Sequence, residues 1–359
     1  MRLGRIEINR QRTVLAGIAF LGIFSAVAAL ATNFQIYEIS AGNYADSMWP
    51  GTGPTITWDE NFTSTPTNVV VKNSVTPSTV LSDAFNTWSS ATAPGTSTLA
   101  TNVQFSFGSA NASLPKSPTL DCKNVVGFSD PNSGDFPTGV VAFAVITTSP
   151  GGFVPGSNCP TYTTPCPIAN CIVDVDIMFN PSQTFATAAA GSNQFDLQSV
   201  ATHEIGHLLG LDHSNIGHAV MYPYGDTSQI GVHQTLWTDD IVGVGHLYPG
   251  PGSADSNGIE GTVTLTQAGT ANVAPLYAAD VEAIDTTTGD VVTETLTDPS
   301  GNYHLRVYDG TYYVYVQSLA PNVNSGPTTI LNFSGQAGYG DNNVANIPAN
   351  PTNYTGKFY

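Results

Sequence analysis

Three histidines in one short segment have the clearest chemical potential in this chain. His203 and His207 are four positions apart, so they lie one turn apart on one face if residues from about 195 to 210 form a helix. Both imidazoles could then bind one metal ion. Gly210 can adopt the left-handed conformation that ends a helix and turns the chain back, which would bring in His213. The spacing predicts a zinc site with three nitrogen ligands and one open position for water.

A glutamate beside these histidines suggests that the zinc site is catalytic. Glu204 follows the first histidine directly, so its carboxylate is placed to take a proton from a zinc-bound water. The alternative is a helix with two surface histidines that are four residues apart by chance. The fixed positions of Gly210 and His213, and Met221 eight residues after the third histidine, argue against that alternative.

The hydrophobic pattern of the same segment supports a helix with two different faces. Asp196 is a suitable N-cap residue for it. At about 100° per residue, the apolar side chains fall on one arc and the two histidines lie largely opposite. The apolar residues are Leu197, Ala201, Ile205, Leu208 and Leu209. One face is therefore expected to be core and the other to carry metal ligands.

Composition excludes several classes of partner. The 359 residues allow two or three domains, and the formal net charge is −18. Such a charge disfavours binding to nucleic acid and to anionic membrane surfaces. Charged residues make up only 10% of the chain, and small polar residues and proline are plentiful, as is typical of an exported, loop-rich β protein.

The N-terminus indicates the compartment. Arginines precede an uncharged apolar run over residues 14–30, and small residues follow it, so residues 1–31 are interpreted as a cleaved signal peptide. The alternative is a retained membrane anchor, since the run is slightly long for a signal and slightly short for a spanning helix. In either case the remainder is expected to be secreted or displayed on the cell surface.

The cysteines agree with an oxidising compartment. Their number is even and they fall within one stretch of about fifty residues, which predicts two disulfides in one of three pairings. Zinc binding by these cysteines is the alternative, but their spacings lack a Cys-x₂-Cys pair. The four candidates are Cys122, Cys159, Cys166 and Cys171.

Residues 32–54 are expected to be a short polar lead-in, and residues 55–250 the first domain. Period-two and period-3.6 patterns within this domain predict alternating strands and helices. Strands are predicted at 55–61, 103–107, 124–129, 139–147 and 171–180, and helices at 77–91, about 195–210 and 238–247, the last with Thr238 as its N-cap. The first helix is expected to bury the apolar residues that recur at helical spacing, Val80, Leu81, Ala84, Phe85 and Trp88. The spare histidines, His218, His233 and His246, have no ligand spacing among themselves and are expected in loops or on the surface. Asp174 and Asp176 share one side of the last strand; we interpret them as part of a solvated face, with a calcium ion or hydrogen bonds to the loop of the metal site as alternatives.

Residues 251–258 have the composition of a linker, and an all-β region follows. Short alternating strands over 259–320, separated by Gly- and Asp-containing turns, predict a small antiparallel sandwich. Residues 321–359 are rich in Asn, Gly and Pro and are expected to form an irregular tail or extra strands. No catalytic set of residues is recognised in this second region, so an accessory role is expected for it.

The residues 200–214, followed by Ala219-Val220-Met221-Tyr222-Pro223, resemble the metzincin zinc endopeptidases. Ser214 after the third histidine is similar to the matrixin, or matrix-metalloproteinase, branch. The resemblance implies an α+β catalytic domain with a twisted five-stranded mixed sheet and three helices. It also implies that Met221 forms a turn beneath the metal, that Val141 and Ala142 lie on an edge strand that holds a peptide, and that Pro223 and Tyr224 belong to a wall of the pocket.

Two departures from the family pattern bear on metal content and activation. This chain has no histidine before His203, and Phe143 stands where a ligand of a second, structural zinc would lie, so one zinc is expected. Residues 32–54 contain no cysteine, so restraint by a cysteine-bearing propeptide is not expected there. The second region resembles carboxypeptidase regulatory-like modules, which have a transthyretin-like fold, in its Ile259-Glu260-Gly261 and Thr297 to Tyr303 segments.

The sequence therefore predicts a secreted zinc-dependent endopeptidase in which Glu204 activates a zinc-bound water. Its partner would be a protein or peptide substrate, without nucleic acid, and a monomer is expected that does not span the membrane unless the N-terminal signal is retained. The alternative is a non-catalytic extracellular binding or surface protein that keeps the zinc site as a scaffold. A purely structural site would not need Glu204, which is not a zinc ligand.

Overall fold

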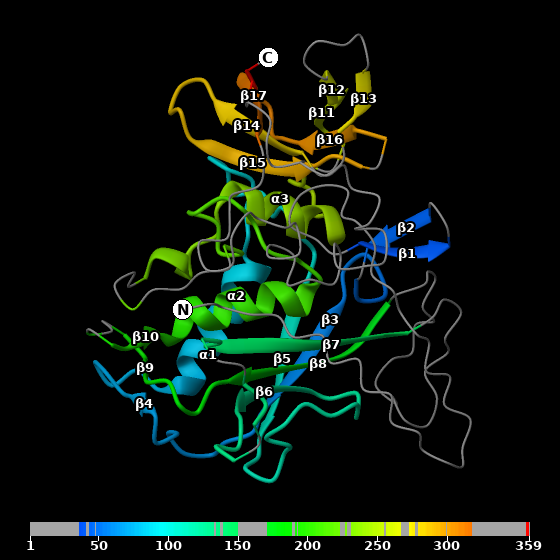
Figure 1. Cartoon of the computed structure of the whole chain (residues 1–359). Helices are drawn as coiled ribbons and strands as arrows, with labels where there is room; N and C mark the ends of the chain where they lie inside the picture. The colour runs from blue at the N-terminus through cyan, green and yellow to red at the C-terminus, as the bar shows by residue number, and fades with distance from the viewer. Residues whose placement is uncertain are drawn as a thin grey trace.

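A computed structural model describes most of the two predicted regions (Figure 1). The described residues are 36–40, 43–46, 48–132, 134–136, 139–149, 171–188, 191, 193–222, 227, 231–254, 256–266, 273–276, 279–298, 300–317 and 357–358. The predicted signal peptide lies outside them, as does the predicted tail except for its last short strand. Within the described part of the chain, no helix is both long and apolar enough to cross a membrane.

A five-stranded mixed sheet forms the base of the first region. Its strand order is β5-β3-β6-β8-β7, in which β7 alone runs antiparallel to its neighbour and lies at one end. The sheet is built from β3 (Thr55–Glu60), β5 (Gln104–Ala110), β6 (Asn124–Phe128), β7 (Ala142–Ser149) and β8 (Cys171–Phe179). All five strands overlap the segments in which the sequence predicted them.

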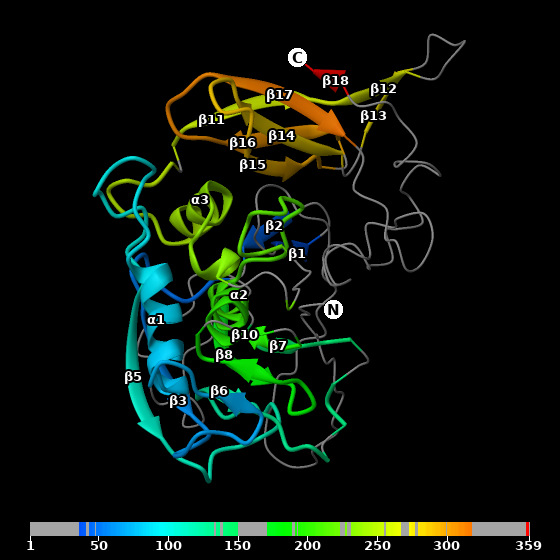
Figure 2. The ribbon, with the colours of Figure 1, turned by 90° about the vertical axis from the view of Figure 1, so that its left-hand side faces the viewer.

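Two helices pack beside each other above this sheet, and a third lies beyond them (Figures 1 and 2). They are α1 (Pro77–Ser89), α2 (Leu197–Leu209) and α3 (Thr238–Leu247), with a short 3₁₀ turn, η1 (Val232–Gln234), between the last two. The apolar residues predicted for α1 are buried, and the Trp88 Nε1 donates to the carbonyl of Thr202 in α2 at 2.8 Å. The mixed five-stranded sheet and three helices agree with the predicted catalytic-domain fold.

The N-cap of the last helix differs from the prediction by one residue. Thr238 was expected to cap it, but Trp237 has the extended backbone of the cap and Thr238 is the first helical residue. The cap is supplied instead by the Asp240 carboxylate, which accepts from the backbone N of Trp237 at 2.8 Å. An acidic residue in the first turn thus replaces the threonine hydroxyl as acceptor.

The predicted lead-in contains more structure than expected. β1 (Ile36–Ser40) and β2 (Asn43–Asp46) form an antiparallel pair, and Met48 makes a bridge to the start of β8. Trp49 is 1% exposed and belongs to the main core. A smaller parallel sheet on the other side of the domain combines β4 (Val69–Val70), β9 (Phe185–Ala186) and β10 (Phe195–Asp196).

The interpretation of Asp174 and Asp176 as a solvated face is wrong. Both side chains are buried in β8, at 2% and 1% exposure. Asp176 accepts from the backbone N atoms of Thr119 at 2.7 Å and Val125, in β6, at 3.0 Å, so its hydrogen bonds do not go to the site loop. The pKa of each carboxyl is raised, chiefly by burial, and that of Asp174 also by the charge of Asp176.

These raised pKa values predict that Asp174→Asn stabilises the protein increasingly as pH rises. A carboxyl whose pKa is higher in the folded state than the ordinary 3.8 loses stability as pH rises above that value, because the folded state then holds more protons than the unfolded state. We expect a gain on the order of 1 kcal/mol at about pH 8 and almost none at about pH 4, measured by thermal unfolding in calcium-free buffer. Asp83→Asn, at an exposed position on α1, is the matched control. A change in stability on Asp174→Asn that is the same at pH 8 as at pH 4 would refute this assignment.

The region after the linker consists of antiparallel strands. A four-stranded sheet has the order β15-β14-β17-β18, and two further pairs are β11–β16 and β12–β13. The strands are β11 (Gly258–Thr262), β12 (Thr264–Thr266), β13 (Val273–Pro275), β14 (Asp280–Asp285), β15 (Val291–Leu296), β16 (Asn302–Arg306), β17 (Tyr312–Gln317) and β18 (Lys357–Phe358). Alternation in the sequence predicts strands at 259–266, 280–285, 291–297, 303–307 and 312–317, and each of these segments overlaps one or two of the observed strands, whereas β13 and β18 were not predicted. The assembly of the strands into a sandwich stays a prediction.

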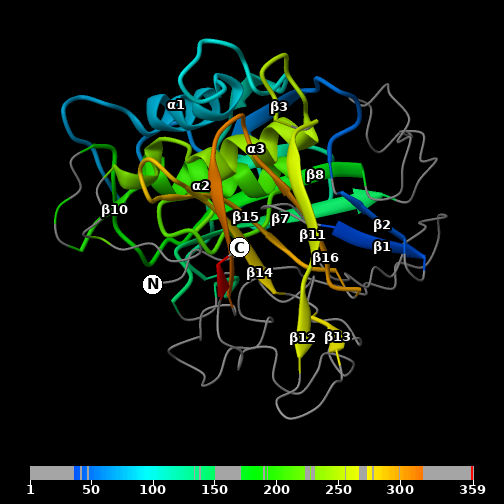
Figure 3. The same ribbon diagram turned by 90° about the horizontal axis from the view of Figure 1, so that it is seen from above.

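The C-terminal strands lie against α3, on the side of α3 that faces away from the five-stranded sheet (Figures 1 and 2). Viewed from above, they extend over α2 and α3 (Figure 3). This contact is polar at several points; for example, the Trp237 Nε1 donates to the carbonyl of Val291 at 2.9 Å. The second region therefore touches the elements that follow the histidine segment.

Candidate metal centre

The helix α2 and the turn after it bring the three histidines together. Asp196 caps the helix by accepting from the backbone N of Ser199 at 2.8 Å, as predicted. Gly210 ends it with a φ of 103°, the left-handed conformation that favours glycine. The chain then reverses, and the Nε2 atoms of His207 and His213 lie 3.2 Å apart. One nitrogen from each of the three histidines lies within 4.8 Å of the other two.

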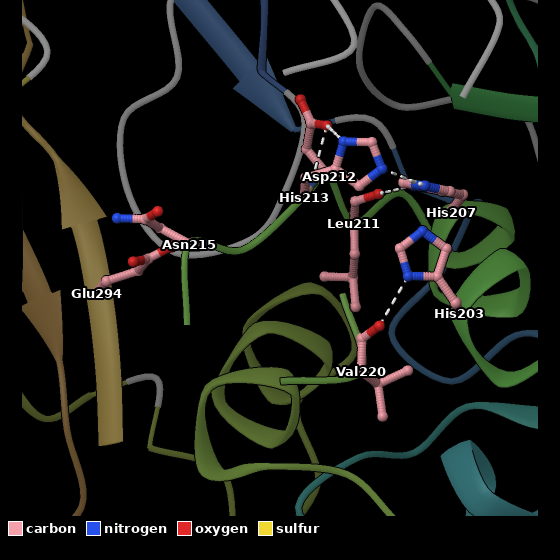
Figure 4. A network of polar contacts seen from close by, with 8 residues as sticks. All are labelled: His203, His207, Leu211, Asp212, His213, Asn215, Val220 and Glu294. Atoms are coloured by element: carbon pink, nitrogen blue, oxygen red, sulfur yellow. Dashed lines mark hydrogen bonds and ion pairs between the residues drawn. The ribbon is translucent and has the colours of Figure 1, made fainter. Parts of the chain in front are cut away.

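Backbone carbonyls orient the rings of His203 and His207, whereas the Nδ1 of His213 lies 3.9 Å from the Oδ1 of Asp212 (Figure 4). The Nδ1 of His203 hydrogen-bonds to the carbonyl of Val220 at 2.7 Å, and the Nδ1 of His207 to that of Leu211 at 2.8 Å. Carbonyls accept only, so both Nδ1 atoms carry the proton and both Nε2 atoms present a lone pair. Burial lowers the pKa of His203 to about 4, which favours the neutral ring.

These histidines fit a zinc ion. The Nε2 of His203 is buried and has no hydrogen-bond partner among the described residues. Tetrahedral zinc with Zn–N distances of about 2.0–2.1 Å requires its nitrogen ligands to be about 3.3 Å apart, close to the 3.2 Å between His207 and His213. Backbone carbonyls behind the ligating rings are also typical of protein metal sites. The donor set therefore supports one metal ion bound by three imidazoles.

Glu204 projects from the same helix and is also buried, at 0% exposure. Neither of its carboxyl oxygens has a hydrogen-bond partner among the described residues. Burial raises the pKa of Glu204 well above its usual range, and the nearby backbone N–H of Ala144 on β7 opposes this rise. A buried carboxyl with so few polar neighbours is costly to keep unless a ligand interacts with it.

Met221 lies directly against α2, as a turn beneath the metal requires. A Cβ added at Gly206 would meet the Met221 sulfur at 2.2 Å and the ring of Trp88 at 2.9 Å. Gly206 therefore permits the close contact between the helix and the methionine. The backbone N of Ser214 donates to the Met221 carbonyl at 2.9 Å, which connects this turn to the residue after the third histidine.

Asp240 accepts hydrogen bonds from the turn that contains Met221, and the sequence did not predict this role. Its Oδ2 accepts from the backbone N of Val220 at 2.8 Å and its Oδ1 from that of Met221 at 3.1 Å. The carbonyl of the same Val220 orients His203. Burial, and then repulsion from Asp239, raises the pKa of Asp240 to about 7. The only sequence signal was an acidic pair in the first turn of α3.

Asp240→Asn is expected to weaken zinc binding by about 10- to 100-fold, the usual effect of losing a residue that orients a metal ligand. The amide can accept through only one oxygen, so its NH₂ group would face one of the backbone N–H groups that the carboxylate now accepts. Zinc affinity is measured by competition with a chromogenic chelator. Asp83→Asn, exposed on α1, serves as control and should leave the affinity unchanged. Equal affinities for Asp240→Asn and wild type would rule out the positioning role.

Two residues that are far apart in the sequence, Trp49 and Tyr248, hydrogen-bond to carbonyls at the C-terminal end of α2. The Nε1 of Trp49 donates to the Leu208 carbonyl at 2.8 Å, and the hydroxyl of Tyr248 donates to the Leu209 carbonyl at 2.7 Å. The backbone N of Trp49 in turn donates to that hydroxyl at 3.0 Å. Carbonyls at a helix C-terminus lack partners within the helix, so these two residues satisfy them and fix the last turn before Gly210.

The other predicted site residues are placed only in part. Val141 and Ala142 are buried at the start of β7, and β7 is an end strand of the sheet as predicted. Pro223 and Tyr224 lie outside the described residues. Phe143 is buried beside Phe136, with ring centroids 4.6 Å apart.

Among the cysteines, Cys122 and Cys171 are buried, while Cys159 and Cys166 lie outside the described residues. The two disulfides stay a prediction. The spare histidines were expected in loops or on the surface. This is wrong for His233, which is 4% exposed and whose Nε2 lies 3.4 Å from the Gly217 carbonyl.

A buried three-histidine cluster with an adjacent glutamate, on a helix above a mixed sheet, is the arrangement expected of a zinc metallopeptidase domain. Comparison with known families agrees: residues 166–249 match the family model described as matrixin. This match supports a catalytic domain that is similar to those of the matrix metalloproteinases.

Individual relatives show the same similarity over short stretches. The chain is 49% identical over 63 residues to Metalloendoproteinase 5-MMP of Arabidopsis thaliana, which covers 18% of this chain and 17% of the relative. It is 50% identical over 56 residues to karilysin of Tannerella forsythia, covering 16% and 11%. It is 43% identical over 77 residues to macrophage metalloelastase of Oryctolagus cuniculus, covering 21% and 16%. The chain thus spans less than a fifth of the length of each of these relatives.

Proposed function

We propose that this protein is a zinc-dependent endopeptidase that hydrolyses peptide bonds in protein or peptide substrates. The observation that carries the proposal is the convergence of three histidine nitrogens beside Glu204, a buried carboxyl whose oxygens have no partner among the described residues. The similarity of residues 166–249 to matrixins supports the same reaction class. We further propose that residues 55–250 form the catalytic domain and residues 259–320 an accessory module, and that the protein acts outside the cell.

In this proposal His203, His207 and His213 hold one zinc ion, and Glu204 moves the proton. A bound zinc ion supplies a Lewis acid that polarises the scissile carbonyl and lowers the pKa of a water in its open position. Glu204 takes the proton of the attacking water and gives it to the leaving nitrogen as the C–N bond breaks. Its raised pKa suits this exchange, because a carboxyl with an ordinary pKa would hold the proton too weakly.

The substrate is proposed to lie along β7. As an end strand, β7 can hydrogen-bond an extended peptide as an additional strand, which would use the backbone near Val141 and Ala142. The proximity of the Ala144 amide, on β7, to Glu204 supports this proposal. Pro223 and Tyr224 are proposed to contribute to the pocket for the residue that follows the cleaved bond.

The proposal is tested by incubating the purified, zinc-loaded full chain with denatured casein and with a quenched peptide library. We expect cleavage that stops on addition of a zinc chelator and returns when zinc is restored. Cleavage within peptides, rather than removal of terminal residues, identifies an endopeptidase by mass spectrometry. A correctly folded protein that binds zinc but cleaves neither substrate would favour the non-catalytic binding protein instead.

A further inference from the structure

Three buried carboxylates from the C-terminal sheet converge where that sheet meets the loop after His213. They belong to Asp280 and Glu282 on β14 and to Glu294 on β15. One oxygen from each lies within 4.8 Å of the others, and the side chains are 0%, 7% and 7% exposed. The register explains the convergence: Glu282 is directly opposite Glu294, and Asp280 is two residues along the same strand and so points to the same face. Like charges in this arrangement destabilise a sheet.

The cluster is in direct contact with the segment that follows the third histidine (Figure 4). The Oε1 of Glu294 accepts from the backbone N of Asn215 at 2.5 Å, and Figure 4 shows these two residues side by side. The Asn215 Nδ2 donates to the Oδ2 of Asp280 at 2.6 Å. The hydroxyl of Ser214 also lies 3.2 Å from that Oε1. These donors are neutral, and they orient the carboxylates of Glu294 and Asp280.

One carboxylate oxygen gives an independent indication of a ligand. The Oε2 of Glu294 is buried and has no hydrogen-bond partner among the described residues. Burial, followed by the charges of Asp280 and Asp239, raises the pKa of Glu294 well above its usual range. A divalent cation would remove the repulsion and provide a partner for the vacant oxygen.

We propose that Asp280, Glu282 and Glu294 form a calcium site that ties the C-terminal sheet to the loop after the third zinc ligand. The ligand chemistry selects the ion: carboxylate oxygens suit calcium, whereas the three imidazoles of the catalytic site suit zinc. Calcium also tolerates irregular coordination better than magnesium does, as a site shared between strands and a loop requires. This inference does not depend on the proposed peptidase activity.

The test is thermal unfolding and isothermal titration of the zinc-loaded full chain in buffer freed of calcium, with CaCl₂ as the probe. Wild type should bind calcium and melt at a temperature that rises by roughly 5 °C or more at a hundredfold excess over the Kd. Glu294→Gln keeps the acceptor for Asn215 but removes the charge. It should lose the calcium-dependent rise, and should melt at or above the wild-type temperature in the absence of calcium.

Controls separate this site from other acidic groups. Glu260→Gln changes an exposed glutamate in the same region, and Asp174→Asn changes the buried pair in β8; both should retain the calcium response. Glu282→Gln provides a second test at the site itself should Glu294→Gln fail to fold. No calcium binding by wild type, as expected if protons or a protein cation neutralise the cluster, would overturn the proposal. So would an undiminished response in a folded Glu294→Gln or Glu282→Gln protein.

Discussion

Glu204→Gln is expected to reduce peptide hydrolysis by about 100- to 10,000-fold while leaving one equivalent of zinc bound. The glutamine side chain has nearly the same shape, so the helix and the three histidines should keep their positions. It cannot take a proton from the attacking water or return one to the leaving nitrogen. Both effects are measured on one preparation, by kcat/KM on a quenched peptide and by zinc content from atomic emission.

Measuring hydrolysis and zinc content separately distinguishes a catalytic role of Glu204 from a structural one. Glu260→Gln makes the same chemical change on an exposed strand and should alter neither hydrolysis nor zinc content. Wild-type rates in the Glu204→Gln protein would eliminate Glu204 as the general base. Loss of zinc together with activity would instead show that Glu204 supports the metal site structurally.

His207→Ala is expected to abolish both stoichiometric zinc binding and hydrolysis. The Nε2 of His207 lies 3.2 Å from that of His213, and its Nδ1 hydrogen-bonds to the Leu211 carbonyl, so the ring is both a proposed ligand and part of the turn that positions the third histidine. Two remaining imidazoles do not make a tight site at micromolar zinc. Zinc content after gel filtration is the primary measurement, with circular dichroism to confirm that the protein is folded.

His304→Ala is the matched control for that experiment. His304 lies on β16, where its Nδ1 contacts the Oε1 of Glu260 at 2.8 Å. Its removal should leave zinc content and hydrolysis unchanged. A folded His207→Ala protein that retains one tightly bound zinc would contradict the three-histidine site.

The geometry of the histidine segment was predictable because its signals are local. The Asp196 cap, the apolar face of α2, the left-handed Gly210 and the return of His213 all depend on residues within one helix and one turn. Strands were found for the same reason, since period-two alternation is visible in any segment that has one buried face. Most of the C-terminal strands were located although their assembly was not tested.

Features that depend on distant contacts were not predictable from one sequence. The indole of Trp49 bonds to a carbonyl 159 positions away, and the lead-in gave no pattern that indicated this. Asp176 was interpreted as exposed because alternation cannot distinguish a solvent-facing row from a row covered by a loop. The carboxylate of Glu294 meets Asn215 only because two separately predicted regions pack together, and no local pattern encodes such packing.

The expectation of a single zinc was based on Phe143, which stands where a ligand of a second zinc would lie. Phe143 occupies a buried position in an apolar cluster with Val125, Val140 and Met178 on one face of the sheet. These apolar side chains offer no nitrogen or oxygen ligand, and the expectation of a single zinc stays a prediction. The calcium proposal concerns a different part of the molecule and a different ligand chemistry.

The central claim is tested most directly by titrating zinc into chelator-treated full chain while following hydrolysis of a quenched peptide. The proposed site predicts that activity rises linearly and reaches its plateau at one zinc per chain, with no activity before the first addition. Hydrolysis that is independent of zinc, or a fully zinc-loaded and folded chain that cleaves no peptide in a broad library, would contradict the account.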